Sequence, residues 1–333
     1  MTSTSPTQTS EPAANTRTRE FFGVCCGLGA ALLWGLQPIV SRYGVLRSLN
    51  AYDLAAIRFV VSGLLMAPFL FHFRLRGITW FAAFMIAMGA GLLYVIFFNL
   101  GLTFSTASNG GVIAPGANVV ISTIGLYFLA QVIPDRKRLA GIALILLGLA
   151  VVGVERIERL DTHALIGDFL FVLAGGAYAL FAIFSQRHRI SALHSAAIVA
   201  IFSLVVYAPF YLFFGDPGNI VRAPLREVVI QVIVQGIMVA ILATWFYASA
   251  INVMGAGRAV IFVALMPIFS VALAIPLLHE WPTPLEFAGL FLVFVGIATA
   301  LKVVENILGR PLLARPAAPA GASVTGGKDL SAR

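Results

Sequence analysis

The chain has 333 residues, of which 60% are hydrophobic and only 11% charged, with a mean hydropathy of +0.95. A soluble domain carries about a quarter charged residues, so this balance excludes an ordinary soluble protein. At roughly 20 apolar residues per spanning helix, the apolar content fits about ten spans and leaves no room for a large soluble catalytic domain. The net charge of +8 is spread through short loops and tails instead of one stripe, which argues against a nucleic-acid partner.

Ten apolar runs follow one another along the chain, each long enough for a membrane-spanning helix. They are Phe22–Val40, Leu54–Phe71, Ile78–Gly101, Gly110–Leu129, Leu139–Val154, Gly167–Phe184, Ser195–Phe214, Val228–Ala250, Ala259–Leu278 and Phe287–Val304. The two ends of the chain are rich in Thr, Ser, Pro, Ala and Gly without periodicity, which predicts disorder. The sequence therefore predicts an all-α integral membrane protein with ten transmembrane helices.

The basic residues predict which side of the membrane holds the two ends. Ten spans place both termini on one side, and the segments on that side carry fifteen Lys and Arg residues against six in the other set. Cytoplasmic loops are enriched in basic residues. We therefore predict that both termini are cytoplasmic, and the Arg-rich, Lys-poor composition with short loops fits a bacterial cytoplasmic (plasma) membrane.

An internal repeat divides the chain into two halves. At an offset of 148, Phe97–Gly153 aligns without a gap with Trp245–Leu301. The shared residues include Phe98 with Phe246, Val112-Ile113 with Val260-Ile261, Ser122 with Ser270, Pro134 with Pro282, Gly141 with Gly289 and Gly148 with Gly296. Each repeat holds five spans, an odd number, so the copies must lie in opposite orientations. Inverted repeats are typical of secondary transporters that work by alternating access.

The residues of the repeat resemble the drug/metabolite transporter superfamily, and within it the ten-helix group with two EamA domains. The resemblance is carried by Phe246-Tyr247-Ala248-Ser249-Ala250, Gly257-Arg258-Ala259, Leu265-Met266-Pro267, Leu278-His279-Glu280, Gly289 and Gly296, and in the first copy by Trp34-Gly35, Arg58-Phe59, Leu100-Gly101-Leu102 and Thr106-Ala107-Ser108. The first copy departs from the pattern with Val132 where Glu280 would align and with Asn118-Val119 in place of Met266-Pro267.

The resemblance implies a function and a domain division. It implies a transporter without a bound cofactor, for a small organic metabolite such as an amino acid or a related compound, and it favours export. The division is a disordered cytoplasmic tail (1–20), a first EamA-like repeat (21–154), a linker loop (155–166), a second EamA-like repeat (167–304) and a disordered cytoplasmic tail (305–333). Substrate, lipid bilayer and a possible coupling proton are the expected partners, and the chain is expected to be a monomer or homodimer.

Two charged residues are candidates for gating or coupling. Arg58 carries a full charge clearly inside a predicted span, about one turn beyond Asp53. Its role is either structural, by snorkelling or by pairing with Asp53, or functional, by attracting anions at the outer mouth. Glu280 stands beside His279, so it is either part of a proton relay or a ligand of backbone amides that fixes a loop.

Amide and aromatic side chains at mid-helix depth are the candidates for substrate binding. Polar groups at this depth either bond across helices or line a wet cavity. The residues are Trp34, Gln37, Tyr94, Asn99, Asn118, Tyr178, Trp245 and Tyr247. Together they suit a small amphipathic or aromatic solute, while the alternative for each is interhelical bonding or interface anchoring.

Other functions fit the sequence less well. An intramembrane enzyme would need a metal cluster, facing carboxylates or a nucleophile with its base, and the sequence offers none of these. An ATP-driven pump would need a P-loop, which is missing from the sequence. The remaining alternative is a non-transporting membrane receptor or assembly factor, for which an inverted repeat has no obvious use.

Overall fold

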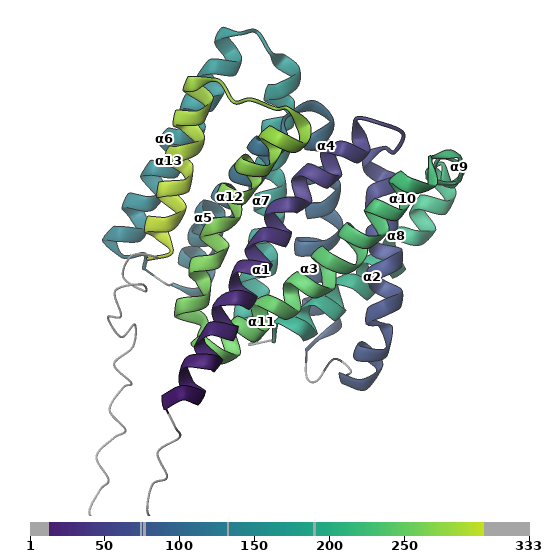
Figure 1. The fold of residues 1–333 in the computed structure, drawn as a ribbon, viewed down its shortest axis with the longest axis horizontal. Helices are drawn as coiled ribbons and strands as arrows, with labels where there is room; N and C mark the ends of the chain where they lie inside the picture. The colour runs from purple at the N-terminus through teal and green to yellow at the C-terminus, as the bar shows by residue number, and fades with distance from the viewer. Residues whose placement is uncertain (1–12, 74, 76–77, 132, 189–190, 303–333) are drawn as a thin grey trace, which may run out of the picture.

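Helices carry the membrane-spanning region because backbone N–H and C=O groups in hydrocarbon must be satisfied within the segment. The computed structural model describes residues 13–73, 75, 78–131, 133–188 and 191–302, and no strand occurs among them (Figure 1). Within this part of the chain nine helices are long and apolar enough to cross a membrane, and Pro284–Ala300 is a shorter apolar helix. The prediction of ten spans is thereby confirmed.

The spans are made of the following elements. They are α1 (Ala13–Val45), α2 (Ala51–Phe73), α3 (Trp80–Ala87) with η1 (Met88–Leu93) and α4 (Tyr94–Phe104), α5 (Ala107–Ala130), α6 (Arg136–Glu158), α7 (Thr162–His188), α8 (Ala192–Phe214), α10 (Leu225–Gln231) with η2 (Val232–Leu242) and α11 (Ala243–Met254), α12 (Ala256–Leu278) and α13 (Pro284–Ala300). The short helix α9 (Pro217–Arg222) lies in the connection between α8 and α10.

Capping side chains fix where several helices begin. The hydroxyl of Thr106 accepts from the N–H of Asn109 at the start of α5, and Asp135 accepts from the N–H of Arg138 at the start of α6. Thr283 and Glu286 form a reciprocal capping box that begins α13. These contacts satisfy N–H groups that a helix start otherwise leaves without partners.

Two predicted boundaries require correction. Helix α1 begins at Ala13, so residues 13–20, predicted to be disordered, are helical. The predicted linker 155–166 is largely helical too, because α6 continues to Glu158 and α7 starts at Thr162. Hydropathy marks only the apolar part of a helix, whereas ion pairs at the polar end of α6 let the helix continue. The predicted tail 305–333 and the end of the last span lie outside the described residues.

The packing of the helices follows a pseudo-two-fold axis that exchanges the repeats. Helix α5 packs against α7, and the equivalent pair is α12 against α1. Likewise α4 packs against α7, and its equivalent is α11 against α1. The helices α2 and α8 are equivalent and pack on each other, as do α6 and α13, which stand side by side at one edge of the bundle (Figure 1).

Glycines allow α6 and α13 to approach closely. A Cβ atom on Gly141 would lie 2.6 Å from the carbonyl oxygen of Gly296, and one on Gly148 would lie 2.5 Å from that of Gly289. The reverse contacts are equally short, at 2.7 Å from Gly296 to Gly141 and 2.9 Å from Gly289 to Gly148. Since Gly141 is equivalent to Gly289 and Gly148 to Gly296, the symmetry maps this contact onto itself. Small residues at such crossings are typical of helix packing in membranes.

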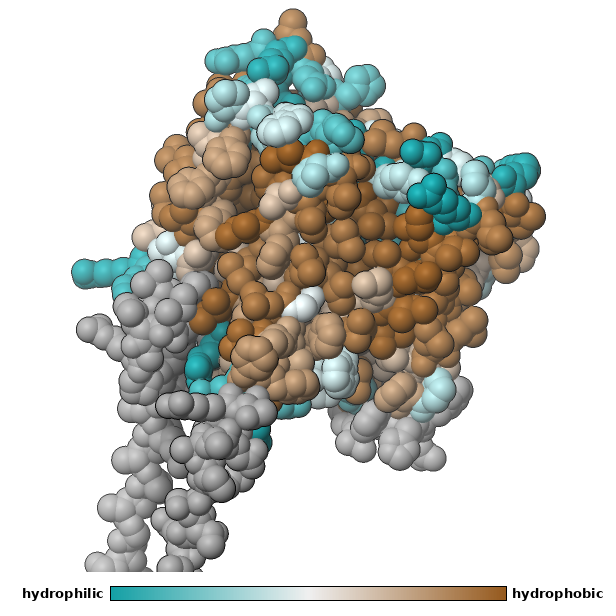
Figure 2. Space-filling view, in the orientation of Figure 1, coloured by the Kyte–Doolittle hydropathy of each residue, from teal (hydrophilic) through white to brown (hydrophobic). Residues whose placement is uncertain are grey.

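A broad apolar surface surrounds the bundle. Figure 2 shows hydrophobic residues across the middle of the face and hydrophilic residues gathered toward its ends. Large apolar side chains contribute to it, among them Leu64, Val205 and Phe291, each more than half exposed. An apolar surface of this extent fits hydrocarbon, because a soluble monomer rarely exposes contiguous apolar patches of more than a few hundred Å².

Candidate functional site

Both repeats interrupt their third span with a π-helical segment. The segment η1 covers Met88–Leu93 and η2 covers Val232–Leu242, and the offset of 148 places one on the other. A π-helical turn has wider i→i+5 hydrogen bonds in place of those of an α-helix. Such turns are rare, and they are frequent at functional sites. The residues that follow or lie within these segments therefore mark the place to look for a binding site.

A polar chain beside η2 includes the arginine predicted from the second span. The Nη1 atom of Arg58 lies 3.5 Å from Oε1 of Gln235, which belongs to η2. The amide nitrogen of Gln235 donates in turn to the hydroxyl of Ser41 in α1. One turn away, Gln231 donates from Nε2 to the carbonyl oxygen of Val40 at 2.8 Å. This chain joins α1 and α2 of the first repeat to the eighth span of the second.

Four aromatic residues extend the same region. Tyr94 and Tyr178 form an edge-to-face pair with ring centroids 5.2 Å apart, and both lie within electrostatic range of Arg58. Trp34 and Tyr247 form a second pair at 5.2 Å, and Tyr247 lies near Tyr178. Trp34 and Tyr94 belong to the first repeat, Tyr178 and Tyr247 to the second. We refer to Arg58, Gln235 and these four aromatic residues as the central cluster.

The other predicted binding residues fall outside these contacts. Gln37 is buried in α1, three residues beyond Trp34. Asn99 and Asn118 each keep an Oδ1 atom that is buried and without a hydrogen-bond partner in the described part of the chain. Trp245 is 45% exposed, and its ring contacts Phe246 with centroids 5.5 Å apart. The structure thus places Tyr94 and Tyr178 near Arg58 and pairs Trp34 with Tyr247, whereas Trp245 is turned toward the surface.

The interpretation of Arg58 as the partner of Asp53 is wrong. The carboxylate of Asp53 accepts from the hydroxyl of Tyr211 and from Nδ2 of Asn219, and from the backbone N–H of Asn50 at 2.9 Å. Asp53 therefore anchors the connection around α9, while Arg58 faces Gln235. Sequence spacing alone could not separate these two arrangements, because the side-chain partners of Asp53, Tyr211 and Asn219, come from the other repeat.

Glu280 links three segments at one end of the bundle. This distal end, opposite the start of α1 and the end of α13, comprises the connections 46–50, 105–106, 159–161, 215–224 and 279–283. Oε1 of Glu280 accepts from Nε of Arg42 at 2.9 Å, and Oε2 accepts from the N–H of Ala107 at 2.8 Å. The interpretation of Glu280 as a ligand of backbone amides fits this geometry, which leaves each carboxylate oxygen already engaged.

A second charged group at the distal end is centred on Arg156. Its Nη2 atom lies 2.6 Å from Oε1 of Glu286 in α13, and its Nε atom 3.6 Å from Oδ2 of Asp168 in α7. Asp168 also accepts from the hydroxyl of Ser105 at 2.6 Å and from Nδ2 of Asn109 at 3.0 Å. All of these contacts cross from one repeat to the other.

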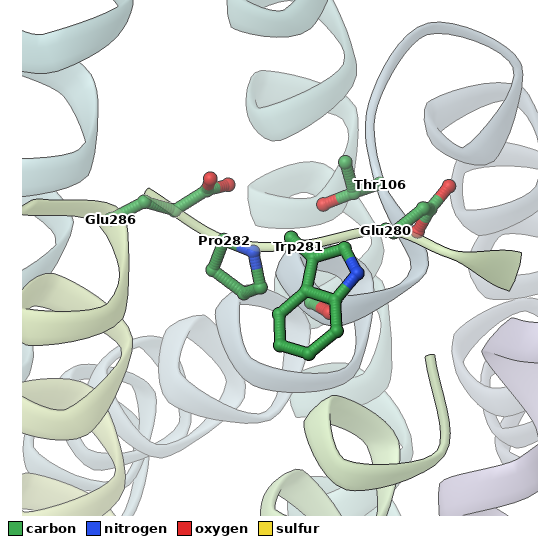
Figure 3. A pocket seen from close by; sticks show the side chains of 6 residues that line it. Thr106, Glu280, Trp281, Pro282 and Glu286 are labelled. Atoms are coloured by element: carbon green, nitrogen blue, oxygen red, sulfur yellow. The ribbon is translucent and has the colours of Figure 1, made fainter. Parts of the chain in front are cut away.

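A small cavity separates the two charged groups of the distal end. It measures about 80 Å³ and is lined by Thr106, Ser108, Glu280, Trp281, Pro282 and Glu286. Figure 3 shows Glu280 and Glu286 at opposite sides, with Trp281 and Pro282 between them. The cavity is far smaller than the roughly 300 Å³ or more of a typical small-molecule site, so it holds water-sized groups at most.

Several residues at these sites were missed by the sequence interpretation. Gln235 and Gln231 carry the same signal as Gln37, a buried amide within a predicted span, and could have been found by it. Arg42, Arg156 and Asp168 lie near the ends of predicted spans, and nothing in their spacing reveals their partners. The described residues contain no group of three or more His, Cys, Asp or Glu side chains arranged to hold a metal ion.

The sequence matches the EamA-like transporter family twice, over residues 21–154 and 165–301. These two matches coincide with the two five-helix repeats that the pseudo-two-fold packing relates. The chain belongs to the EamA-like transporter family. It is accordingly a multi-pass membrane transporter, as the sequence resemblance implied.

Relatives of the chain carry names of the same kind. "Uncharacterized transporter YetK" of Bacillus subtilis (strain 168) is 26% identical over 213 residues, which cover 63% of this chain and 62% of that protein. An "Uncharacterized transporter" of Archaeoglobus fulgidus is 25% identical over 276 residues, covering 80% of this chain and 92% of the relative. The alignment thus spans about three fifths of the Bacillus protein and most of the archaeal one.

A solved structure shares the fold. A crystal structure of a protein superimposes with a TM-score of 0.56 at 18% sequence identity, covering 86% of this chain and 98% of the other. At this level of identity the likeness concerns the arrangement of the helices alone.

Proposed function

We propose that this EamA-like transporter is a secondary transporter that exports a small organic metabolite, such as an amino acid or a related compound, by alternating access, and that the central cluster is its substrate site. The observation that carries the proposal is that both repeats contribute residues to the central cluster. Three of its members come from the first repeat and three from the second, beside equivalent π-helical segments. Substrate sites of inverted-repeat transporters lie near the midplane at the interface between repeats.

The chemistry of the central cluster supports an organic solute. The Trp34–Tyr247 and Tyr94–Tyr178 pairs supply ring surfaces, and Arg58 and Gln235 supply directional polar groups. Sites for small molecules combine such an apolar lining with a few placed polar groups. A phosphorylated sugar would require several Lys or Arg side chains to bind its phosphate. Among the described residues, the central cluster contains Arg58 as its cationic side chain.

The charged groups at the distal end support a two-state mechanism. Glu280 with Arg42 and Arg156 with Glu286 and Asp168 join the repeats on that side. Rocking one repeat against the other to open the distal side would have to separate these pairs, so they stabilise the conformation closed there. With cytoplasmic termini the distal end faces outward, so these pairs support the proposal of an outward-closed conformation in the cytoplasmic membrane.

Transport is tested by comparing metabolites. Medium and cytosol of cells that express the intact protein, a Tyr178→Ala variant or a Tyr127→Ala variant at equal membrane levels are profiled by untargeted mass spectrometry, with empty cells as the baseline. Tyr127 is a matched control, because it is also a tyrosine within a membrane span but its side chain is 44% exposed. We expect at least one metabolite to accumulate outside with the intact protein and with Tyr127→Ala, and at least tenfold less of it with Tyr178→Ala.

The alternative outcomes separate the parts of the proposal. A metabolite that depends on the protein but is unaffected by Tyr178→Ala would refute the site and leave transport standing. A profile identical to that of empty cells for every variant would refute export, and a depletion of the medium would show uptake instead.

A further inference from the structure

Arg58 differs from two other half-buried arginines, Arg42 and Arg156, in its partners. Arg42 and Arg156 each contact a carboxylate, at 2.9 and 2.6 Å. Arg58 has a neutral amide oxygen at 3.5 Å, and no described carboxylate forms an ion pair with it. A charge at membrane depth costs several kcal/mol unless it is paired or reaches water. The central cluster therefore carries an uncompensated positive charge.

Two carboxylates flank this region and are already engaged: Asp53, five residues before Arg58 in α2, and Glu227, eight residues before Gln235. Asp53 accepts from Tyr211, Asn219 and the Asn50 amide, and Glu227 contacts Ser48 and Arg47. Both carboxylates therefore have hydrogen-bond partners of their own and do not neutralise Arg58. The compensating charge for Arg58 is thus one that arrives with a ligand.

The surroundings of Arg58 define what that ligand looks like. Among the described tyrosines, only Tyr207 and Tyr211 form hydrogen bonds through their hydroxyls, so the hydroxyls of Tyr94, Tyr178 and Tyr247 are left to donate to a bound group. The rings of these residues add flat apolar surface. A guanidinium presents two parallel N–H donors, which match the two oxygens of one carboxylate.

We propose that the central cluster selects organic monocarboxylates, with Arg58 binding the carboxylate and the rings of Trp34, Tyr94, Tyr178 and Tyr247 contacting an apolar or aromatic body. This inference rests on the proposed function, because it takes the central cluster as the transport site. One guanidinium balances one negative charge, so the site disfavours dicarboxylates, and an amine without a carboxylate would be repelled by Arg58.

The selectivity is tested on the purified full-length protein in detergent. The probes are benzoate, 3-phenylpropanoate and indole-3-acetate, each compared with its neutral amide, and binding is followed by the ligand-induced shift of the apparent Tm. We expect at least one carboxylate to stabilise the intact protein while its amide does not. Arg58→Gln should lower the affinity for that carboxylate at least tenfold.

Two controls keep the result interpretable. Arg222→Gln removes an arginine that is 67% exposed and paired with Asp216, and should leave the carboxylate affinity unchanged. Arg58→Gln is examined for its own unfolding and its size-exclusion profile, and Arg58→Lys should bind more weakly than the intact protein because an ammonium lacks the planar pair of donors.

The possible outcomes are distinct. Equal stabilisation by an acid and its amide, retention of acid binding by a folded Arg58→Gln protein, or no shift with any of the acids would overturn carboxylate selection. Arg58-dependent acid binding without any exported metabolite would support the selectivity and count against export. Export of a solute without a carboxyl group would support export and count against carboxylate selectivity.

Discussion

At the residue scale, the same side-chain types have different roles according to what surrounds them. Arg42 is bound on two sides, to the Glu280 carboxylate and to the carbonyl oxygen of Leu102, and holds the distal end together. Arg58 has an amide oxygen as its hydrogen-bond partner among the described residues, and we propose that a ligand carboxylate pairs with it. Buried ion pairs are costly to break because the surviving charge is left without compensation. The roles of these arginines are therefore distinguishable by stability measurements as well as by transport.

Removal of Glu280 is expected to destabilise the protein by roughly 3 kcal/mol, because Arg42 would keep a partly buried charge and the Ala107 amide would lose its acceptor. Glu280→Leu combined with Arg42→Leu should cost less than the sum of the single changes, with a coupling of about 1–3 kcal/mol. The measurement is a double-mutant cycle of unfolding in detergent. The exposed Arg222–Asp216 pair serves as the control and should couple by less than about 1 kcal/mol. Additive effects at the Arg42–Glu280 pair would show that the contact has no role in stability.

At the element scale, glycine positions decide how closely the helices pack. Helices α6 and α13 meet at two glycine pairs where a Cβ atom would come within 2.5–2.9 Å of a carbonyl oxygen. The π-helical segments act at the same scale, because they change the helix geometry where η1 leads into Tyr94 and where η2 holds Gln235. Helix packing and helix irregularity together place the central cluster between the repeats.

Gly148→Ala is expected to lower the stability by about 1–3 kcal/mol, since the new Cβ would lie 2.5 Å from the carbonyl oxygen of Gly289 and would force α6 and α13 apart. The matched control is Gly153→Ala on the same helix, where a Cβ atom meets nothing within 4 Å. This control should leave the apparent Tm unchanged or slightly higher, because alanine favours a helix. Equal behaviour of the two variants would disprove the close crossing.

At the scale of the whole molecule, the two repeats pack on each other into one structure. The largest interfaces join a helix of one repeat to a helix of the other, as in α6 with α13, α5 with α7 and α2 with α8. The distal ion pairs cross the same boundary. The alternating access proposed above would therefore have to separate these distal contacts between the repeats.

The orientation of the bundle is tested with alkaline phosphatase, which needs disulfides that form outside the cytoplasm. Fusion after Arg333 should be inactive, whereas insertion after Asp216, in the distal connection between α8 and α10, should be active. The expected pattern follows from the excess of basic residues on the side of the termini. The opposite pattern would place the distal end in the cytoplasm, so that the closed side would be the inner one.

The amino-acid sequence by itself determined the membrane class, the ten spans and the two repeats, because each depends on local hydropathy or on residue identity at a fixed offset. It also indicated Trp34, Tyr94, Tyr178, Tyr247 and Arg58 as unusual at membrane depth. The tertiary structure decided which of them meet, since Trp245 is turned outward and Asp53 bonds to Tyr211 and Asn219 instead of Arg58. It also brought Arg156, Asp168 and Glu286 together. The physical reason is that most of these contacts join residues more than a hundred positions apart, and all of them depend on the crossing and rotation of helices, which local patterns do not encode.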